Sequence, residues 1–180
     1  MDNIRPYLDQ TPRLGERVYI DESARVIGEV VLGDDVSVWP LTVIRGDVNF
    51  VRIGDRTNVQ DGTVIHVSHD GPHAKLGGFA TVIGADCTIG HKAIVHACRI
   101  EDACLIGMGS TVLDGAVVRK HGFLGAGSLL TPGKVMGEGD PVGAGNRDAA
   151  LKPHRFDGRA VGSDPSPLSP CVLLRFALQG

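Results

Sequence analysis

The chain has 180 residues, a formal net charge of -3 and an apolar content of 42%. This length is expected for a single domain, and the apolar content is sufficient for a hydrophobic core. The small net charge gives no general attraction to nucleic acid or to an anionic membrane. No run of 18 apolar residues occurs, and the N-terminal stretch MDNIRPYLDQ lacks the apolar centre of a secretory signal. We therefore expect a cytoplasmic protein.

Aliphatic residues recur every six positions along most of the chain. They stand at Ile20, Val26, Leu32, Val38 and Ile44, at Ile53, Val59 and Ile65, at Ile83, Ile89 and Val95, and at Ile100, Ile106, Val112, Val118, Leu124, Leu130, Met136 and Val142. A period of six fits neither an amphipathic helix nor simple strand alternation. It is typical of a hexapeptide β-helix, in which each unit gives one short strand and one corner. The fold is therefore predicted to be an all-β parallel β-helix.

The hexads also divide the chain into segments. Residues 1–17 are a polar lead-in that we expect to be extended and to cover the first coil. The β-helix domain is predicted over 18–142, with a three-residue insertion at 48–50 and a glycine-rich loop at 69–80. An irregular tail is predicted over 143–180, because its four prolines after position 152 exclude one continuous helix.

Two histidines are placed together by the repeat. If three hexads make one triangular turn, residues 18 positions apart stack on one face. Val95 follows Ile65 by 30 residues, and removal of the 12-residue loop leaves 18. His66 and His96 therefore stand one coil apart on the same face. Adjacent coils are about 4.8 Å apart, so two imidazoles can lean toward one ion.

A third histidine, His91, occupies a different place in its hexad and falls at a neighbouring corner. It cannot readily meet His66 and His96 inside one narrow prism, but it can complete the site from another subunit. A symmetric trimer with metal sites at its interfaces is therefore the natural geometry. Three nitrogen ligands leave one position open, as in catalytic rather than structural zinc sites.

Polar residues upstream of these histidines also lie near the corners of adjacent coils. Gln60 precedes His66 by one hexad and is a candidate to hydrogen-bond an oxygen bound to the metal, and Asn58 lies beside it. The charged residues are Arg45, Asp47 and Asp61, which are candidates for ion pairs across an interface.

The predicted loop contains His69 and His73. An imidazole in a loop near a metal can relay protons, so these two residues are candidates for that role.

Four motifs together resemble the γ-class carbonic anhydrase family. They are RGDVN at 45–49, NVQDG at 58–62, TVIHVS at 63–68 and GHKAIVHAC at 90–98, and the resemblance extends from about Ile4 to Leu130. It implies a left-handed β-helix and a homotrimer. It also implies zinc, or ferrous iron, held by His66 and His96 of one subunit and His91 of the next. Gln60 matches the residue that orients metal-bound hydroxide, and Arg45, Asp47 and Asp61 match the interface pairs.

The activity that this resemblance implies is reversible hydration of carbon dioxide to bicarbonate by metal-bound hydroxide. A dication held by three imidazoles lowers the pKa of bound water from 15.7 to about 7. The prototype of the family carries glutamates near the metal, whereas here Val48 follows Asp47 and the loop offers only Asp70 and two histidines. Proton transfer, and with it the hydration rate, is therefore expected to be slow.

Two other classes of function remain open. One is an acyl or CoA-dependent transferase, in which His69 or His73 deprotonates an acceptor, or a related thioesterase that uses the same metal hydroxide. The other is a non-catalytic, metal-loaded trimer that serves as a scaffold. The transferase leaves the stacked pair of His66 and His96 unexplained.

Overall fold

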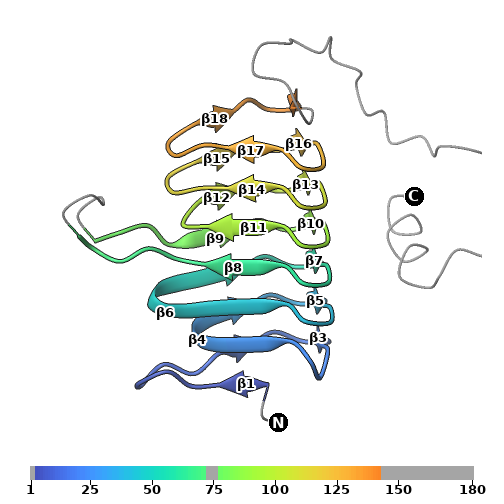
Figure 1. Cartoon of the computed structure of the whole chain (residues 1–180). Coiled ribbons are helices and arrows are strands. Elements are labelled where there is room, and N and C mark those ends of the chain that lie inside the picture. Colours follow the sequence, from blue (N-terminus) through green and yellow to red (C-terminus); the bar gives the residue numbers. More distant parts are fainter. Residues whose placement is uncertain (1–2, 72–76, 143–180) are drawn as a thin grey trace, which may run out of the picture.

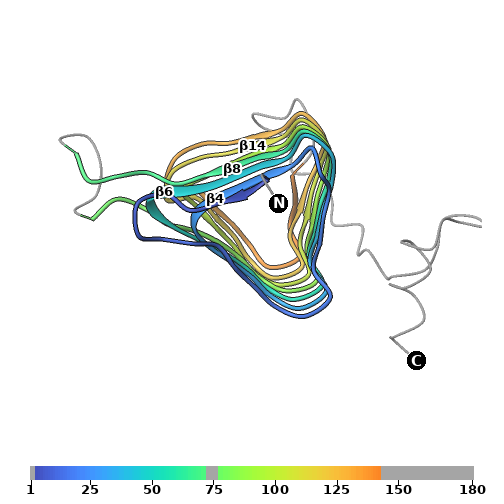
Figure 2. The same cartoon turned by 90° about the horizontal axis from the view of Figure 1, so that it is seen from below.

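The computed structural model describes residues 3–71 and 77–142. These residues form a parallel β-helix with a triangular cross-section, whose coils are stacked from the N-terminal end upward (Figures 1 and 2). All of the regular secondary structure in these residues is β-strand, and no helix there could cross a membrane. The tail predicted over 143–180 lies outside the described residues, and its boundary stays a prediction.

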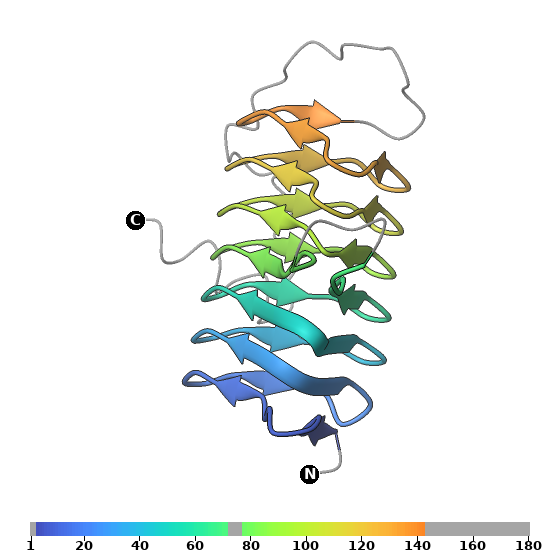
Figure 3. The same cartoon turned by 90° about the vertical axis from the view of Figure 1, so that its left-hand side faces the viewer.

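Three faces make up the prism, which Figure 3 shows from the side. The first face is a seven-stranded sheet. Its strands are β3 (Tyr19–Ile20), β5 (Ser37–Val38), β7 (Asn58–Val59), β10 (Thr88–Ile89), β13 (Leu105–Ile106), β16 (Phe123–Leu124) and β19 (Pro141–Val142). Each strand pairs in parallel with its counterparts in the neighbouring coils.

The second and third faces belong to one 12-stranded sheet, because β4 (Arg25–Leu32) and β6 (Val43–Ile53) run through the corner between them. The other strands of the second face are β1 (Ile4–Arg5), β8 (Val64–His66), β11 (Ile94–His96), β14 (Thr111–Val112) and β17 (Leu129–Leu130). Those of the third face are β2 (Arg13–Leu14), β9 (Thr81–Ile83), β12 (Arg99–Ile100), β15 (Val117–Val118) and β18 (Val135–Met136).

The core is a continuous column of aliphatic side chains along the axis of the prism. The predicted hexad residues from Val26 to Met136 are buried, and Ile20 packs partly buried against them. Each inward residue of a strand is followed by an outward one, since side chains alternate along a strand. His66 follows the buried Ile65 and His96 follows the buried Val95, so both imidazoles point out of the second face.

The predicted loop separates β8 from β9. The described residues at its two ends, 69–71 and 77–80, extend away from the body of the prism (Figure 2). At the base of the loop, Asn49 of β6 donates from its side-chain amide to the carbonyl oxygens of Ser68 (3.3 Å) and Gly77 (3.0 Å). The three-residue insertion that carries Asn49 therefore fastens the base of the loop.

Candidate metal centre

His66 and His96 are neighbours on adjacent coils. They are register partners in the pairing of β8 with β11, as the 18-residue repeat predicts. Their ring centroids are 5.2 Å apart, and Nδ1 of His66 lies 3.3 Å from Nε2 of His96. The side chains are 21% and 30% exposed, so an ion between them would remain accessible from solvent.

An aspartate holds the far nitrogen of each ring. Nε2 of His66 is 2.8 Å from Oδ1 of Asp47, and Nδ1 of His96 is 2.7 Å from Oδ1 of Asp114. An ionised carboxylate only accepts hydrogen bonds, so in neutral rings these two nitrogens carry the hydrogens. The lone pairs of the two rings are then on the nitrogens that face each other.

This arrangement fits a divalent metal ion. Two nitrogens that each lie 2.0–2.1 Å from a tetrahedral zinc ion are about 3.3–3.4 Å apart, and the facing nitrogens are 3.3 Å apart. Carboxylates that accept from the far nitrogen are the usual outer-shell partners of histidine ligands. In residues 3–71 and 77–142, however, no group of three or more metal-ligating side chains gathers. Within this part of the chain, two candidate ligands, His66 and His96, thus come together without a third.

His91 lies apart from this pair. It follows β10, at the corner where the first face turns into the second, whereas His66 and His96 end the second-face strands β8 and β11. Its Nδ1 is 3.0 Å from Oδ2 of Asp61, and its side chain is 46% exposed. His91 is therefore also an imidazole with one nitrogen held by an aspartate and the other available.

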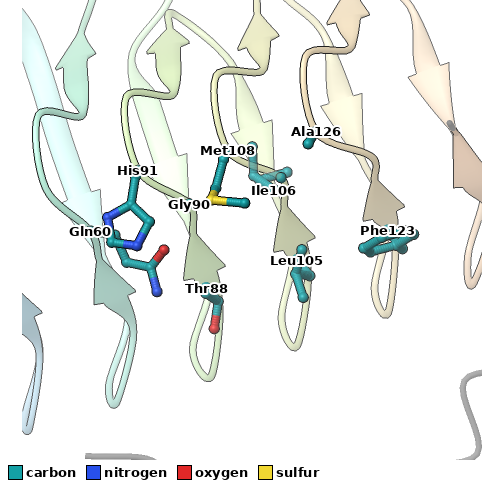
Figure 4. Close-up of a pocket in the computed structure, with 10 residues that line it drawn as sticks. Gln60, Thr88, Gly90, His91, Leu105, Ile106, Met108, Phe123 and Ala126 are labelled. Carbon is teal, nitrogen blue, oxygen red and sulfur yellow. The ribbon is translucent and has the colours of Figure 1, made fainter. Parts of the chain in front are cut away.

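A groove of about 440 Å³ runs from His91 along the corner. Gln60 and His91 lie side by side at one end of it, and apolar side chains continue along it (Figure 4). The rest of its lining is Thr88, Gly90, Leu105, Ile106, Gly107, Met108, Phe123 and Ala126. The predicted amide and the third histidine thus share one wall, which is separate from the wall with His66 and His96.

Asn58 is held by the coil below it. Its Oδ1 accepts from Nε1 of Trp39 (2.6 Å) and from the hydroxyl of Ser37 (3.0 Å). This oxygen is therefore already satisfied, and only the amide NH₂ of Asn58 is left to contact a ligand. A catalytic role for Asn58 and Gln60 stays a prediction.

The three charged residues predicted at an interface have partners inside the chain. Arg45 pairs with Asp47, and Asp61 contacts His91. Burial raises the pKa of Asp47, but the hydrogen bond with His66 and the charge of Arg45 outweigh it, and the pKa stays below its ordinary value. Asp47 is therefore an anion beside His66. Pairing across subunits stays a prediction for all three.

Of the two proposed proton carriers, His69 is exposed in the segment that follows β8. His73 lies outside the described residues. Asp114 was not among the predicted site residues, although it could have been found, because it follows His96 by 18 residues and so stands one coil above it.

No family model matches the chain. Protein YrdA of Escherichia coli is 53% identical over 113 residues, which cover 63% of this chain and 61% of YrdA. The mitochondrial γ carbonic anhydrase 2 of Arabidopsis thaliana is 41% identical over 135 residues, which cover 75% of this chain and 48% of that protein. The chain thus spans about half to three-fifths of the length of these curated relatives.

Among solved structures, a hexapeptide transferase family protein from Anaplasma phagocytophilum superposes with a TM-score of 0.72. It is 39% identical, and the match covers 79% of both chains. The chain belongs to the γ-carbonic anhydrase-like family of hexapeptide-repeat proteins. The parallel β-helix and the stacked histidines of this γ-carbonic anhydrase-like chain agree with the motifs that indicated the family from the sequence.

Proposed function

We propose that this chain is a metal-dependent carbonic anhydrase-like lyase that interconverts carbon dioxide and bicarbonate. The observation that carries the proposal is the pair formed by His66 and His96, whose facing ring nitrogens are 3.3 Å apart. An aspartate accepts a hydrogen bond from the far nitrogen of each ring, and this supports a metal site over two solvated surface histidines. Zinc is the proposed metal, with ferrous iron as the alternative.

The site is proposed to be completed by a second subunit. His91 carries the same aspartate support as the other two histidines but stands on the other wall, with Gln60 beside it. A closed threefold ring presents the His91 corner of each copy to the His66 and His96 pair of the next, so one interface geometry makes three equal sites. Exposed apolar side chains adjoin both walls, at Val64, Ile94, Leu105, Met108, Phe123 and Leu129.

The side chains then divide the chemistry between them. Zinc bound by His66, His96 and the next subunit's copy of His91 would supply an acidic water as the nucleophile for carbon dioxide. The apolar part of the groove receives carbon dioxide, which is itself apolar. The amide of Gln60 orients the attacking oxygen by a hydrogen bond. Each hydration releases one proton, for which the exposed His69 ring is the described candidate carrier.

Metal content is the test of this proposal. Protein purified without oxygen is expected to contain about one zinc or iron per chain, because each chain contributes one complete set of three histidines. His96→Ala is expected to lose the metal and any acceleration of carbon dioxide hydration. Stopped-flow with a pH indicator measures the hydration rate. His121→Asn is the matched control, since His121 is an exposed corner residue with a φ of 60° that asparagine tolerates. A wild type without metal would refute the proposal.

One finding favours a second candidate, acyl transfer. The Anaplasma structure belongs to a protein named as a hexapeptide transferase, at 39% identity. In that case, His69 or His73 would accept the proton of an acceptor that attacks a thioester, and the histidine pair would not take part. Acetyl-CoA turnover that survives His96→Ala but is lost in His69→Ala would support this alternative.

A further inference from the structure

We infer that Asp114 is a positioning residue that selects the Nδ1-protonated tautomer of His96 and thereby keeps the metal site open. This inference rests on the proposed metal-dependent function. Oδ1 of Asp114 lies 2.7 Å from Nδ1 of His96. Because the carboxylate can only accept, it places the hydrogen on Nδ1 and leaves the lone pair of Nε2 pointing at Nδ1 of His66, 3.3 Å away.

The other tautomer of His96 would close the site. With the hydrogen on Nε2, His96 would donate to Nδ1 of His66 and satisfy the lone pair that a metal needs. His66 itself is held in the Nε2-protonated form by Asp47, 2.8 Å away, so its Nδ1 is an acceptor in either case. The pair thus has two arrangements, one with a hydrogen bond between the rings and one with two lone pairs facing a shared point. Asp114 stabilises the second arrangement.

The β-helix itself sets the position of Asp114. The next residue, Gly115, donates its N–H to the carbonyl of Ala97 at 2.7 Å, and Ala97 directly follows His96. On the other side, Gly133 of the next coil donates to the carbonyl of Asp114 at 2.9 Å. Backbone hydrogen bonds therefore fasten the turn that carries Asp114 to the coils below and above, and they hold its carboxylate beside His96.

The first test is the tautomer of His96 in metal-free protein. Long-range ¹H–¹⁵N spectra of the imidazole rings distinguish the two tautomers, and they are recorded at about pH 8.5, well above the usual histidine pKa of about 6.5. His96→Gln and His66→Gln assign the signals. We expect the Nδ1–H form for His96 and the Nε2–H form for His66. In Asp114→Ala, His96 is expected to change to the Nε2–H form.

The second test is zinc affinity, measured by competition with a chromophoric chelator. Asp114→Ala is expected to bind zinc about 10–100-fold more weakly than the wild type, the usual effect of losing such a partner. Asp35→Ala is the control, because it removes an equal charge from a corner carboxylate that pairs with Arg17 and not with a histidine. It is expected to leave zinc affinity unchanged.

The two tests separate the inference from the proposed function. An Nε2–H tautomer for His96 in the wild type, or an unchanged tautomer in Asp114→Ala, would overturn the inference whether or not zinc binds. An unchanged zinc affinity in Asp114→Ala would overturn it as well. If the wild type bound no zinc at all, the proposed function would fail, and the tautomer spectra would still decide the role of Asp114.

Discussion

At the scale of single residues, each of the three histidines has an aspartate on one ring nitrogen. His66 has Asp47, His96 has Asp114 and His91 has Asp61. Single hydrogen bonds of this kind contribute only modestly to folding stability. Their effect here is on the direction of the rings, because each aspartate fixes which nitrogen carries the lone pair. The same contact occurring three times is what makes these histidines differ from ordinary surface residues.

Arg17 and Asp35 form a pair of another kind, a bidentate ion pair between two coils with both N···O distances at 2.7 Å. The hydrogen bond from Arg17 lowers the pKa of Asp35 below its ordinary value. A carboxylate with a lowered pKa stabilises the folded state above its unfolded pKa of about 3.9, and this contribution is lost as the pH falls through the lower folded-state pKa.

Asp35→Asn is therefore expected to lower the urea midpoint slightly at pH 7, and this difference should shrink in acid, as the pH falls through the lowered pKa of the folded state and the native Asp35 is itself protonated. Circular dichroism during urea titrations at pH 7 and at a series of acidic pH values measures the effect. Asp9→Asn, in the turn between β1 and β2, removes the same charge and serves as the control. A midpoint difference that persisted in acid would contradict the assignment of the effect to the ion pair.

At the scale of elements, the corners decide how closely the coils stack. A Cβ added at Gly90, which follows β10, would lie 2.7 Å from the backbone nitrogen of Met108 and 2.8 Å from the carbonyl oxygen of Ile106. A different corner tolerates side chains in the left-handed region, at Arg17, Asp35, Arg56, Asp86, Ala103 and His121. Glycine is thus required at position 90 because the backbone of the next coil approaches closely. A positive φ does not by itself require glycine, since several turns adopt it with other residues.

Gly90→Ala is expected to destabilise the chain by about 1–3 kcal/mol, since the added methyl overpacks the backbone of the next coil. Gly139→Asn is the matched control. Gly139 has a φ of 69° and no atom within 4 Å of an added Cβ. Asparagine tolerates this conformation, so a change of less than about 0.5 kcal/mol is expected. Equal losses for the two variants, measured by urea unfolding, would contradict the role of close stacking.

Much of this element-level structure follows from the sequence. The six-residue period predicts the inward residues, and the 18-residue turn predicts that His66 stacks on His96. The outward contacts are harder to predict, because they depend on how far each side chain leans. Asp47 is 19 residues before His66, so the bond between them does not follow the repeat, which the insertion at 48–50 shifts. The groove beside His91 likewise depends on the side chains of four coils.

At the scale of the whole molecule, the prism carries the residues of the proposed site in two separate groups on different sides of one corner. One wall carries His91 and Gln60, and the other carries His66 and His96. Ile94 lies on the second face between His91 and His96 in the sequence and is 44% exposed, so assembly is expected to cover it. Ile94→Glu would place a charge in that interface and is expected to give monomers that bind no metal but keep the β-sheet signal in circular dichroism.

The control for this variant is Val135→Glu. Val135 is 58% exposed on β18 of the third face, away from both walls, so its variant is expected to remain trimeric in light scattering coupled to size-exclusion chromatography. Loss of assembly in Val135→Glu with retention in Ile94→Glu would place the interface on the third face instead.

The most direct measurement mixes two variants that are each expected to lack a metal site, His91→Ala and His96→Ala. If the site is shared between subunits, co-assembled trimers contain interfaces at which an intact His91 meets an intact His66 and His96. In an equal mixture, about a quarter of the interfaces are complete, since half of the subunits supply each wall. We expect zinc to return to about that fraction of the sites. No recovery of zinc in verified mixed trimers, or full zinc content in either variant alone, would contradict a metal site divided between subunits.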